Sequence, residues 1–311
     1  MKKKWLAMML VVVCAVSLAA CGSSSTESGE GAADTQVSGD SGTEGTEDED
    51  TGQELELTFE SLTVVDNEEC SIVITGIDED NIWGYALEVE LENKSADKTY
   101  MYAVQSAAIN GVQTDPFYAE EVAAGKKSLD EIYFDADELA EYGVDTVTDI
   151  EISMHVYDSD DWTADDVAEV TVHVYPYGEE NAVTFERESQ ETDNVLVDND
   201  YVTVIVTGYE MDSIWGYTVN VYLVNKTDSE VMFSVDDASV NGYMADPIWA
   251  ESVSAGKCAF DSIYWYDSTL EEIGITDPEN EIETIEFSLR AYNNEDWSAD
   301  DYVEQTVTLN P

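Results

Sequence analysis

The chain has 311 residues, of which 70 are Asp or Glu and 11 are Lys or Arg, so its formal net charge at pH 7 is −59. Such a charge excludes nucleic acid and anionic lipid headgroups as partners of the folded part. The hydrophobic content of 43%, with 18 Tyr and 7 Trp, excludes a chain that is disordered throughout. One or two domains with cores of their own are expected at this length.

Residues 1–20 have the pattern of a secretory signal peptide. Met1–Lys4 is basic, and the apolar stretch Trp5–Val16 is shorter than the roughly 20 residues that a transmembrane helix needs. The sequence Leu-Ala-Ala-Cys that ends at Cys21 resembles the lipobox of bacterial lipoproteins. This resemblance implies cleavage before Cys21 and a diacylglycerol thioether on its sulfur, and two acyl chains suffice for stable anchoring. We therefore expect a lipid anchor at the extracellular face of the bacterial cell membrane; ordinary secretion with Cys21 unmodified is the alternative.

Residues 21–54 form a linker after the predicted cleavage site. Gly, Ser, Thr, Glu and Asp dominate it, only three side chains beyond Cys21 are apolar, and no Lys or Arg occurs. Such a segment cannot bury a core, so we expect a solvated acidic tether. Among the remaining cysteines, Cys70 and Cys258 fall at non-equivalent positions of the repeat described next. We therefore expect buried thiols and not a disulfide.

The rest of the chain is an internal duplication with an offset of 131 to 135 residues. Ile-Trp-Gly-Tyr at 82–85 returns at 214–217, and Asn-Lys-Ser at 93–95 returns as Asn-Lys-Thr at 225–227. The further matched pairs are Asn110-Gly111 with Asn241-Gly242, Asp115-Pro116 with Asp246-Pro247, Ala124–Lys126 with Ala255–Lys257, and Asp161–Asp166 with Asp296–Asp301. The offset between matched residues is larger near the end of the chain, and this increase requires a four-residue insertion near Asp277–Asn280. We predict two copies of one domain, at residues 55–178 and 190–311.

Within each copy, apolar and polar side chains alternate with the period of a β-strand. The alternation predicts strands over Ser71–Ile77, 83–91, Ile150–Tyr157 and Val167–Tyr175 and over their copies, with Trp83 and Trp215 on the core face. The two Asn-Gly pairs predict tight hairpins. Helical spacing occurs at Asp135–Tyr142 and its copy 267–273. The pattern predicts an all-β chain of two tandem antiparallel immunoglobulin-like β-sandwiches.

The order of these signals resembles a known group of domains. A strand that ends in Asn-Lys-Ser/Thr, then Asn-Gly, then Ala-Gly-Lys before an aromatic-rich strand is similar to the immunoglobulin-like domains of Gram-positive surface lipoproteins. Many of those resemble the fold of an immunoprotective extracellular antigen. The resemblance covers residues 55–311 as two units and implies the fold and the location. It does not imply an activity, because it rests on turns and strands.

The sequence gives little support for nucleophilic catalysis. His155 and His173 lie in predicted strands with their side chains toward solvent, and their copies are Arg290 and Thr308. No Gly-x-Ser-x-Gly, P-loop or His-Glu-x-x-His sequence occurs. We therefore predict a non-enzymatic surface protein for binding, adhesion or structure. An extracellular hydrolase that acts on polysaccharide through acidic residues is the alternative, and a concave, carboxylate-lined cleft would indicate it. A solute-binding lipoprotein would need two α/β lobes.

Two acidic loops are candidate calcium sites, since Ca²⁺ takes six to eight oxygen ligands. Their spacing is not that of an EF-hand, so a solvated connection, with Trp162 folded back onto the edge of the sandwich, is the favoured interpretation. No other cofactor is expected. The candidate ligands are Asp158, Asp160, Asp161, Asp165 and Asp166 in the first copy and Glu295, Asp296, Asp300 and Asp301 in the second.

Aromatic residues are the candidates for partner binding. Tyr118 and Trp249 follow the two Asp-Pro turns, and Trp162 and Trp297 lie in the acidic loops. An exposed ring at these positions stacks on a sugar or anchors a protein partner. For Tyr118 and Trp249, packing into the end of the sandwich is the favoured alternative. Whether the partner is a protein or a polysaccharide stays open.

Overall fold

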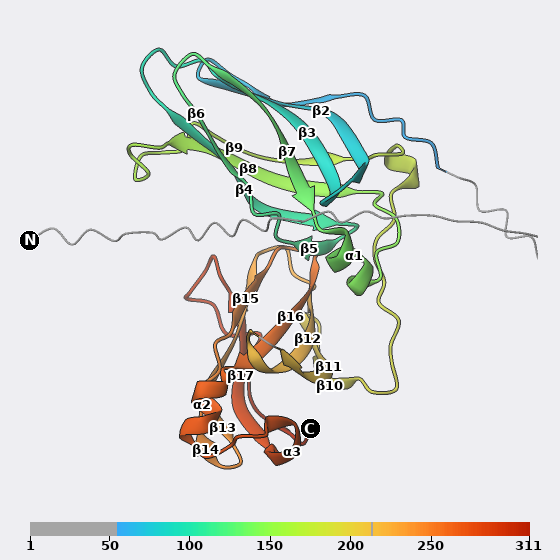
Figure 1. Cartoon of the computed structure of the whole chain (residues 1–311), viewed down its shortest axis with the longest axis vertical. Coiled ribbons are helices and arrows are strands. Elements are labelled where there is room, and N and C mark those ends of the chain that lie inside the picture. The colour runs from blue at the N-terminus through green and yellow to red at the C-terminus, as the bar shows by residue number, and fades with distance from the viewer. Residues whose placement is uncertain (1–54, 213) are drawn as a thin grey trace, which may run out of the picture. The chain divides into compact units, whose positions relative to one another are not determined.

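The computed structural model describes residues 55–212 and 214–311, and this part of the chain is nearly all β-structure (Figure 1). The predicted signal peptide, Cys21 and the acidic tether lie outside the described residues. The helices within the described ranges are short, and none is long and apolar enough to cross a membrane.

Nine strands and one helix form the first half of this region. The sheet β1-β2-β3-β7 faces a second group of strands in the order β5-β4-β8-β9, with β6 beside β4. Helix α1 (Ala136–Tyr142) connects β7 to β8. The strands are β1 (Leu62–Asp66), β2 (Cys70–Asn81), β3 (Gly84–Asn93), β4 (Tyr100–Ile109), β5 (Val112–Thr114), β6 (Ala119–Val122), β7 (Lys127–Phe134), β8 (Ile150–Asp158) and β9 (Ala168–Val174).

The second half repeats this order. Strands β10-β11-β12-β16 form one layer, and β14-β13-β17-β18 with β15 form the other. A parallel bridge between Val112 and Cys258 joins β5 to β16. The strands are β10 (Asn194–Asp198), β11 (Val202–Asp212), β12 (Gly216–Asn225), β13 (Val231–Val240), β14 (Tyr243–Met244), β15 (Ala250–Val253), β16 (Cys258–Trp265), β17 (Ile285–Asn293) and β18 (Val303–Leu309). The helical turns are η1 (Glu179–Asn181), α2 (Asp267–Glu272) and α3 (Pro278–Glu281).

Local sequence accounts for these elements. Asn110 and Asn241 both have φ 52° and precede glycines at φ 89° and 81°, so both Asn-Gly pairs form the predicted hairpins. Helix α1 starts after Asp135, whose carboxylate accepts the main-chain N–H groups of Asp137 and Glu138. The four-residue insertion predicted from the offset coincides with α3. The second half repeats the element order of the first, and the duplication into two separate domains stays a prediction.

Two groups of buried side chains form the cores. In the first, Ile72 and Leu87 of one sheet pack with Tyr102 and Met154 of the facing sheet. In the second, residues of β11 and β12 pack with Phe233 and others of the facing sheet. The first core also includes Tyr222 and Cys258 of the second half. Cys70 and Cys258 are free and buried, which confirms the expected buried thiols.

The prediction that Trp83 and Trp215 belong to the core is wrong. Their side chains are 68% and 45% exposed. Both residues lie in the turn before β3 or β12, where Asn81 accepts the N–H of Trp83 and Asp212 accepts that of Trp215. The alternation of the sequence extends back into the turn that precedes the strand, and in that turn the period of two does not report which face is buried.

Candidate functional site

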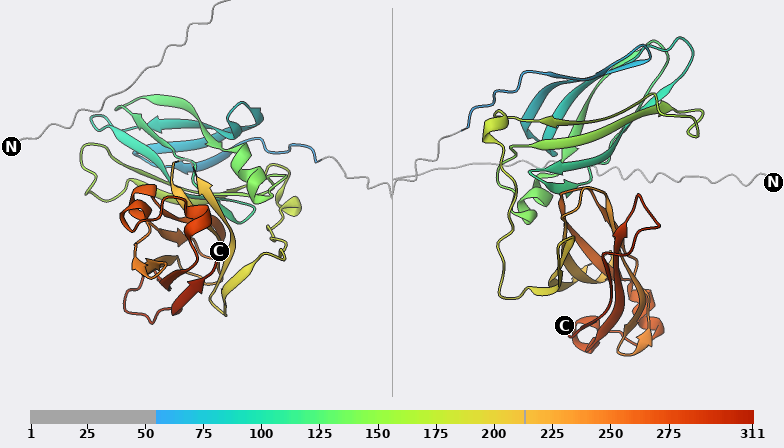
Figure 2. Two further views of the ribbon diagram at one scale, coloured as in Figure 1. Left: turned by 60° about the horizontal axis from the view of Figure 1, so that its bottom comes forward. Right: turned by 180° about the vertical axis from the view of Figure 1, so that it is seen from behind.

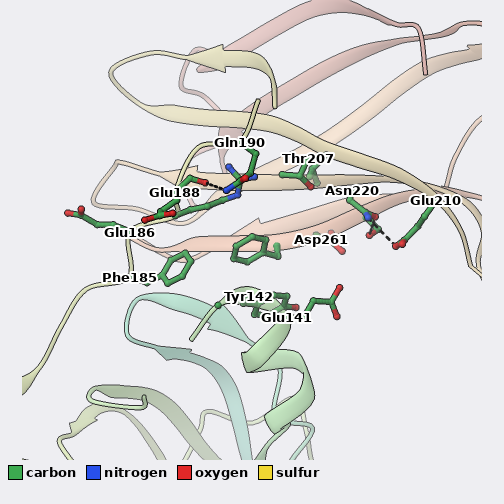
Figure 3. Close-up of a pocket in the computed structure, with 15 residues that line it drawn as sticks. Glu141, Tyr142, Phe185, Glu186, Glu188, Gln190, Thr207, Glu210, Asn220 and Asp261 are labelled. Atoms are coloured by element: carbon green, nitrogen blue, oxygen red, sulfur yellow. Dashed lines mark hydrogen bonds between the residues drawn. The ribbon is translucent and has the colours of Figure 1, made fainter. Parts of the chain in front are cut away.

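A pocket of about 590 Å³ lies between helix α1, the segment 185–190 and strands β11, β12 and β16 (Figure 3). This volume is within the range of small-molecule sites. Figures 1 and 2 both show α1 beside β16. One wall is aromatic, since Tyr142 stacks on Phe260 with ring centroids 4.7 Å apart and Phe185 meets the edge of Phe260 at 6.0 Å.

Carboxylates and amides gather at the other end of the pocket (Figure 3). The Nδ2 group of Asn220 donates to Glu210 at 3.0 Å, and Oδ1 of Asn220 accepts the hydroxyl of Ser262 at 2.8 Å. Arg187 also lines the pocket, but two hydrogen bonds of 2.7 and 2.8 Å bind its guanidinium to Asp193. These bonds raise the pKa of Arg187 and lower that of Asp193. The pocket therefore keeps an excess of negative charge.

Two carboxyl groups have altered acidity: Asp261, which lines this end of the pocket, and Glu251, which does not line it. Burial raises the pKa of Asp261, which accepts the indole N–H of Trp249 at 2.7 Å. Burial, and next the charge of Asp261, raise the pKa of Glu251 to about 7. The amide of Gln113, in the first half, donates to Glu251 at 2.9 Å. Such a pair of neighbouring acids is chemically able to hold or release a proton near neutral pH.

A second feature is a group of exposed and half-buried apolar and aromatic side chains that recurs in both halves. The Trp83 patch consists of Ile82, Trp83, Phe117 and Tyr133. Its side chains are between 37% and 97% exposed. The Trp215 patch consists of Ile214, Trp215, Ile248, Tyr264 and Tyr266. In it, the ring of Trp215 lies 5.0 Å from that of Tyr264 and 6.3 Å from that of Tyr266.

The predicted calcium ligands do not converge. Asp158 forms an ion pair with Lys98 at 3.0 Å, Asp166 lies 3.0 Å from His155, and Asp301 binds Arg290 at 2.9 Å. In residues 55–212 and 214–311, no group of three or more His, Cys, Asp or Glu side chains is placed to hold a metal ion. The remaining candidates, Asp160, Asp161, Asp165, Glu295, Asp296 and Asp300, lie along exposed parts of the same loops.

The candidate partner-binding aromatics divide into two kinds. Trp249 is buried, so the idea that its ring contacts a partner is wrong. Its indole instead packs within the second core and donates to Asp261. Tyr118 is half-buried and donates to Asp130 at 3.3 Å. Trp162 and Trp297 are 78% and 77% exposed, which contradicts the predicted folding back of Trp162 onto the sandwich edge.

Both histidines lie beside surface carboxylates. Nδ1 of His155 lies 3.0 Å from Asp166, and His173 contacts Asp149 at 2.8 Å and Glu151 at 3.2 Å. Both histidines lie on the face of their strand opposite the core, as the alternation predicts. Neither lines the pocket described above.

Sequence reasoning missed the pocket and both patches. The residues that form the pocket, among them Phe185, Glu210 and Asp261, come from distant segments, and no spacing in the sequence connects them. For the patches a signal existed. The motif Ile-Trp-Gly-Tyr contains a glycine directly after the tryptophan, and a glycine inside an alternating pattern indicates a turn or a bulge.

No family model matches the chain, and no curated protein matches it. Among solved structures, the chain is similar to the crystal structure of YadV chaperone at 10% sequence identity and a TM-score of 0.23, over 72% of this chain and 92% of that one. It is also similar to the exo-chitosanase CsxA of Amycolatopsis orientalis at 12% identity and a TM-score of 0.23, over 79% of this chain. The chain spans 27% of that enzyme's length. At these TM-scores, neither likeness carries an argument about function.

Proposed function

We propose that this chain is a non-enzymatic binding protein, attached by a lipid on Cys21 to the extracellular face of the bacterial cell membrane, with two tandem immunoglobulin-like domains. One observation supports a binding role: the Trp83 patch and the Trp215 patch expose large aromatic side chains at equivalent places of the two halves. Single exposed apolar residues are ordinary, but grouped aromatics mark interaction sites. Neither patch is needed to fill a core.

Two measurements test the anchor and the absence of catalysis. Fractionation of bacteria that express the full chain should place it with the membrane, and Cys21→Ala should release it. Full chain incubated with xylan, cellulose and chitosan should produce no reducing ends. Membrane retention of the Cys21→Ala variant would defeat the anchor, and production of reducing ends would defeat the non-enzymatic assignment.

A hydrolase is the second candidate, and the carboxylate-lined pocket supports it. Asp261 has the raised pKa of a general acid, and Glu210 lines the same end. Against this role, the Trp249–Asp261 hydrogen bond has a counterpart in Tyr118–Asp130 of the first half, where it belongs to the packing of the strands. Reducing ends that disappear with Asp261→Asn and with Glu210→Gln, but not with Glu188→Gln, would establish the hydrolase.

A further inference from the structure

We propose that the Trp83 patch and the Trp215 patch bind cationic side chains, so that the partner is a protein segment rich in Lys or Arg. This inference rests on the proposed binding function and names the chemistry of the partner. The first argument for a basic partner is the negative charge of the chain. Residues 55–311 contain 60 acidic and 8 basic residues. A basic segment is therefore electrostatically complementary to the described part of the chain.

Seven of the eight basic residues of the described part, all except Lys126, already form ion pairs with the chain's own carboxylates. The ion pairs are Lys94–Asp66, Lys98–Asp158, Lys127–Glu90, Arg187–Asp193, Lys226–Asp198, Lys257–Glu151 and Arg290–Asp301. None of these basic residues lines the pocket beside the Trp83 patch. The negative charge around that patch is therefore not neutralised by the chain's own cations.

Rings and carboxylates meet at the Trp83 patch. A depression of about 360 Å³ is lined by Trp83, Phe117 and Tyr133 together with Asp115, Asp135 and Glu138. A cation over an aromatic face is attracted by the negative electrostatic potential of the ring. An adjacent carboxylate adds Coulomb attraction. One ammonium or guanidinium group satisfies both kinds of lining at once, whereas a neutral sugar uses only the rings.

The Trp215 patch has the same ingredients. Tyr264 and Tyr266 lie 5.6 Å apart and flank Trp215, so three rings form one aromatic surface. Asp212 accepts the main-chain N–H groups of Ile214 and Trp215, which places its charge at the base of the patch. Two such patches on one chain allow a single basic segment or multivalent partner to bind with avidity.

The test measures binding of a deca-lysine peptide to the full chain in detergent micelles at two salt concentrations. The comparison probes are a Gly-Ser decapeptide and cellohexaose. The variants are Trp83→Ala, Trp215→Ala and their combination. The matched control is Trp162→Ala with Trp297→Ala, because those rings are at least as exposed and also lie among acids. Urea unfolding of every variant checks that the fold is retained.

We expect the Trp83→Ala/Trp215→Ala variant to weaken deca-lysine binding roughly tenfold, with the control variant within about twofold of the parent. Equal weakening in both double variants would overturn the inference, because binding would then follow the general charge. If replacing Trp83 and Trp215 weakens only the binding of cellohexaose, the inference of a basic partner is overturned, but the proposed binding function stands. Unchanged binding of every probe in the patch variants would overturn both.

Discussion

The indole N–H of Trp249 donates a hydrogen bond to the carboxylate of Asp261 at 2.7 Å, and the phenol of Tyr118 makes the corresponding bond to Asp130 in the first half. In each half the aromatic residue precedes the short strand β15 or β6, and the aspartate lies on β16 or β7. The bond therefore joins the segment that follows the Asp-Pro turn to the strand beside it. This pairing explains why the sequence repeats an aromatic residue at 118 and 249 without exposing the ring at 249.

Replacing Trp249 by Phe removes the donor to Asp261 and keeps most of the ring. A mostly buried carboxylate then loses a hydrogen bond, so the free energy of unfolding should fall by about 1–3 kcal/mol. The measurement is urea unfolding at pH 7. Trp162→Phe, at an exposed ring, should stay within about 0.5 kcal/mol of the parent. Adding Asp261→Asn to Trp249→Phe should recover part of the loss, and no recovery would show that the lost stability comes from packing.

Glu251 predicts a pH dependence of stability. Its pKa is about 7 in the folded chain against an ordinary 4.5, because burial and the charge of Asp261 disfavour ionisation. The unfolded chain therefore releases the proton first as pH rises. The protonated Glu251 therefore contributes its full stabilisation of the folded chain below about pH 4.5, and this contribution is lost by about pH 7. After allowance for solvent screening, the loss should be about 1–2 kcal/mol.

The comparison is chemical unfolding of the parent and of Glu251→Gln between pH 5 and 8. The amide cannot ionise, and its oxygen is still able to accept the hydrogen bond of Gln113. The variant should therefore gain stability relative to the parent as pH rises. Glu188→Gln, at an exposed position of the pocket, should follow the parent. Parallel curves for the parent and Glu251→Gln would exclude this role.

Gly216 is required where the Trp215 turn approaches β16. Its φ is 85°, and an added Cβ would overlap the main-chain oxygen of Trp265 and lie 3.0 Å from the nitrogen of Asp267. Gly242 has a similar φ of 81° with no atom within 4 Å of such a Cβ. Both changes to Ala incur the left-handed backbone penalty of about 1–2 kcal/mol. Gly216→Ala should lose a further 1–3 kcal/mol or so for the overlap. Equal thermal shifts would contradict the close approach.

Local features of the fold could be predicted from the sequence. The period of two in Ile150–Tyr157, the two Asn-Gly hairpins and the helix after Asp135 each depend on neighbouring residues, and the structure confirms all of them. The Asn-Lys-Ser/Thr repeat was predicted only as a strand end. Its asparagines are buried, and Nδ2 of Asn93 and of Asn225 each donates to main-chain carbonyls of a loop and a strand.

The candidate site could not be predicted in the same way. The pocket depends on which face of β16 meets α1, and that contact brings Tyr142 to Phe260 across more than a hundred residues of sequence. The acidity of Glu251 depends on burial beside Asp261, which composition alone does not reveal among so many acids. The wrong prediction that Trp83 is buried has a local cause, because alternation does not mark the boundary between a turn and a strand.

Calcium should stabilise the chain no more than magnesium does. Several of the predicted ligands already have partners in the structure: Lys98 lowers the pKa of Asp158 through a hydrogen bond, and Asp161 and Asp296 accept the hydroxyls of Thr163 and Ser298. A bound ion would have to displace these partners and gather carboxylates that lie apart. General screening of the large negative charge acts for both ions alike.

The measurement is thermal unfolding of the full chain with chelator, with millimolar Ca²⁺ and with Mg²⁺ at matched ionic strength. Equal shifts in Tm are expected for the two ions. Asp161→Asn with Asp296→Asn should leave both shifts unchanged apart from the small loss of charge. A Tm increase of several degrees with Ca²⁺ alone, removed by these two changes, would instead show that the acidic loops rearrange around a calcium ion, since only binding to the native state raises Tm in an ion-specific way.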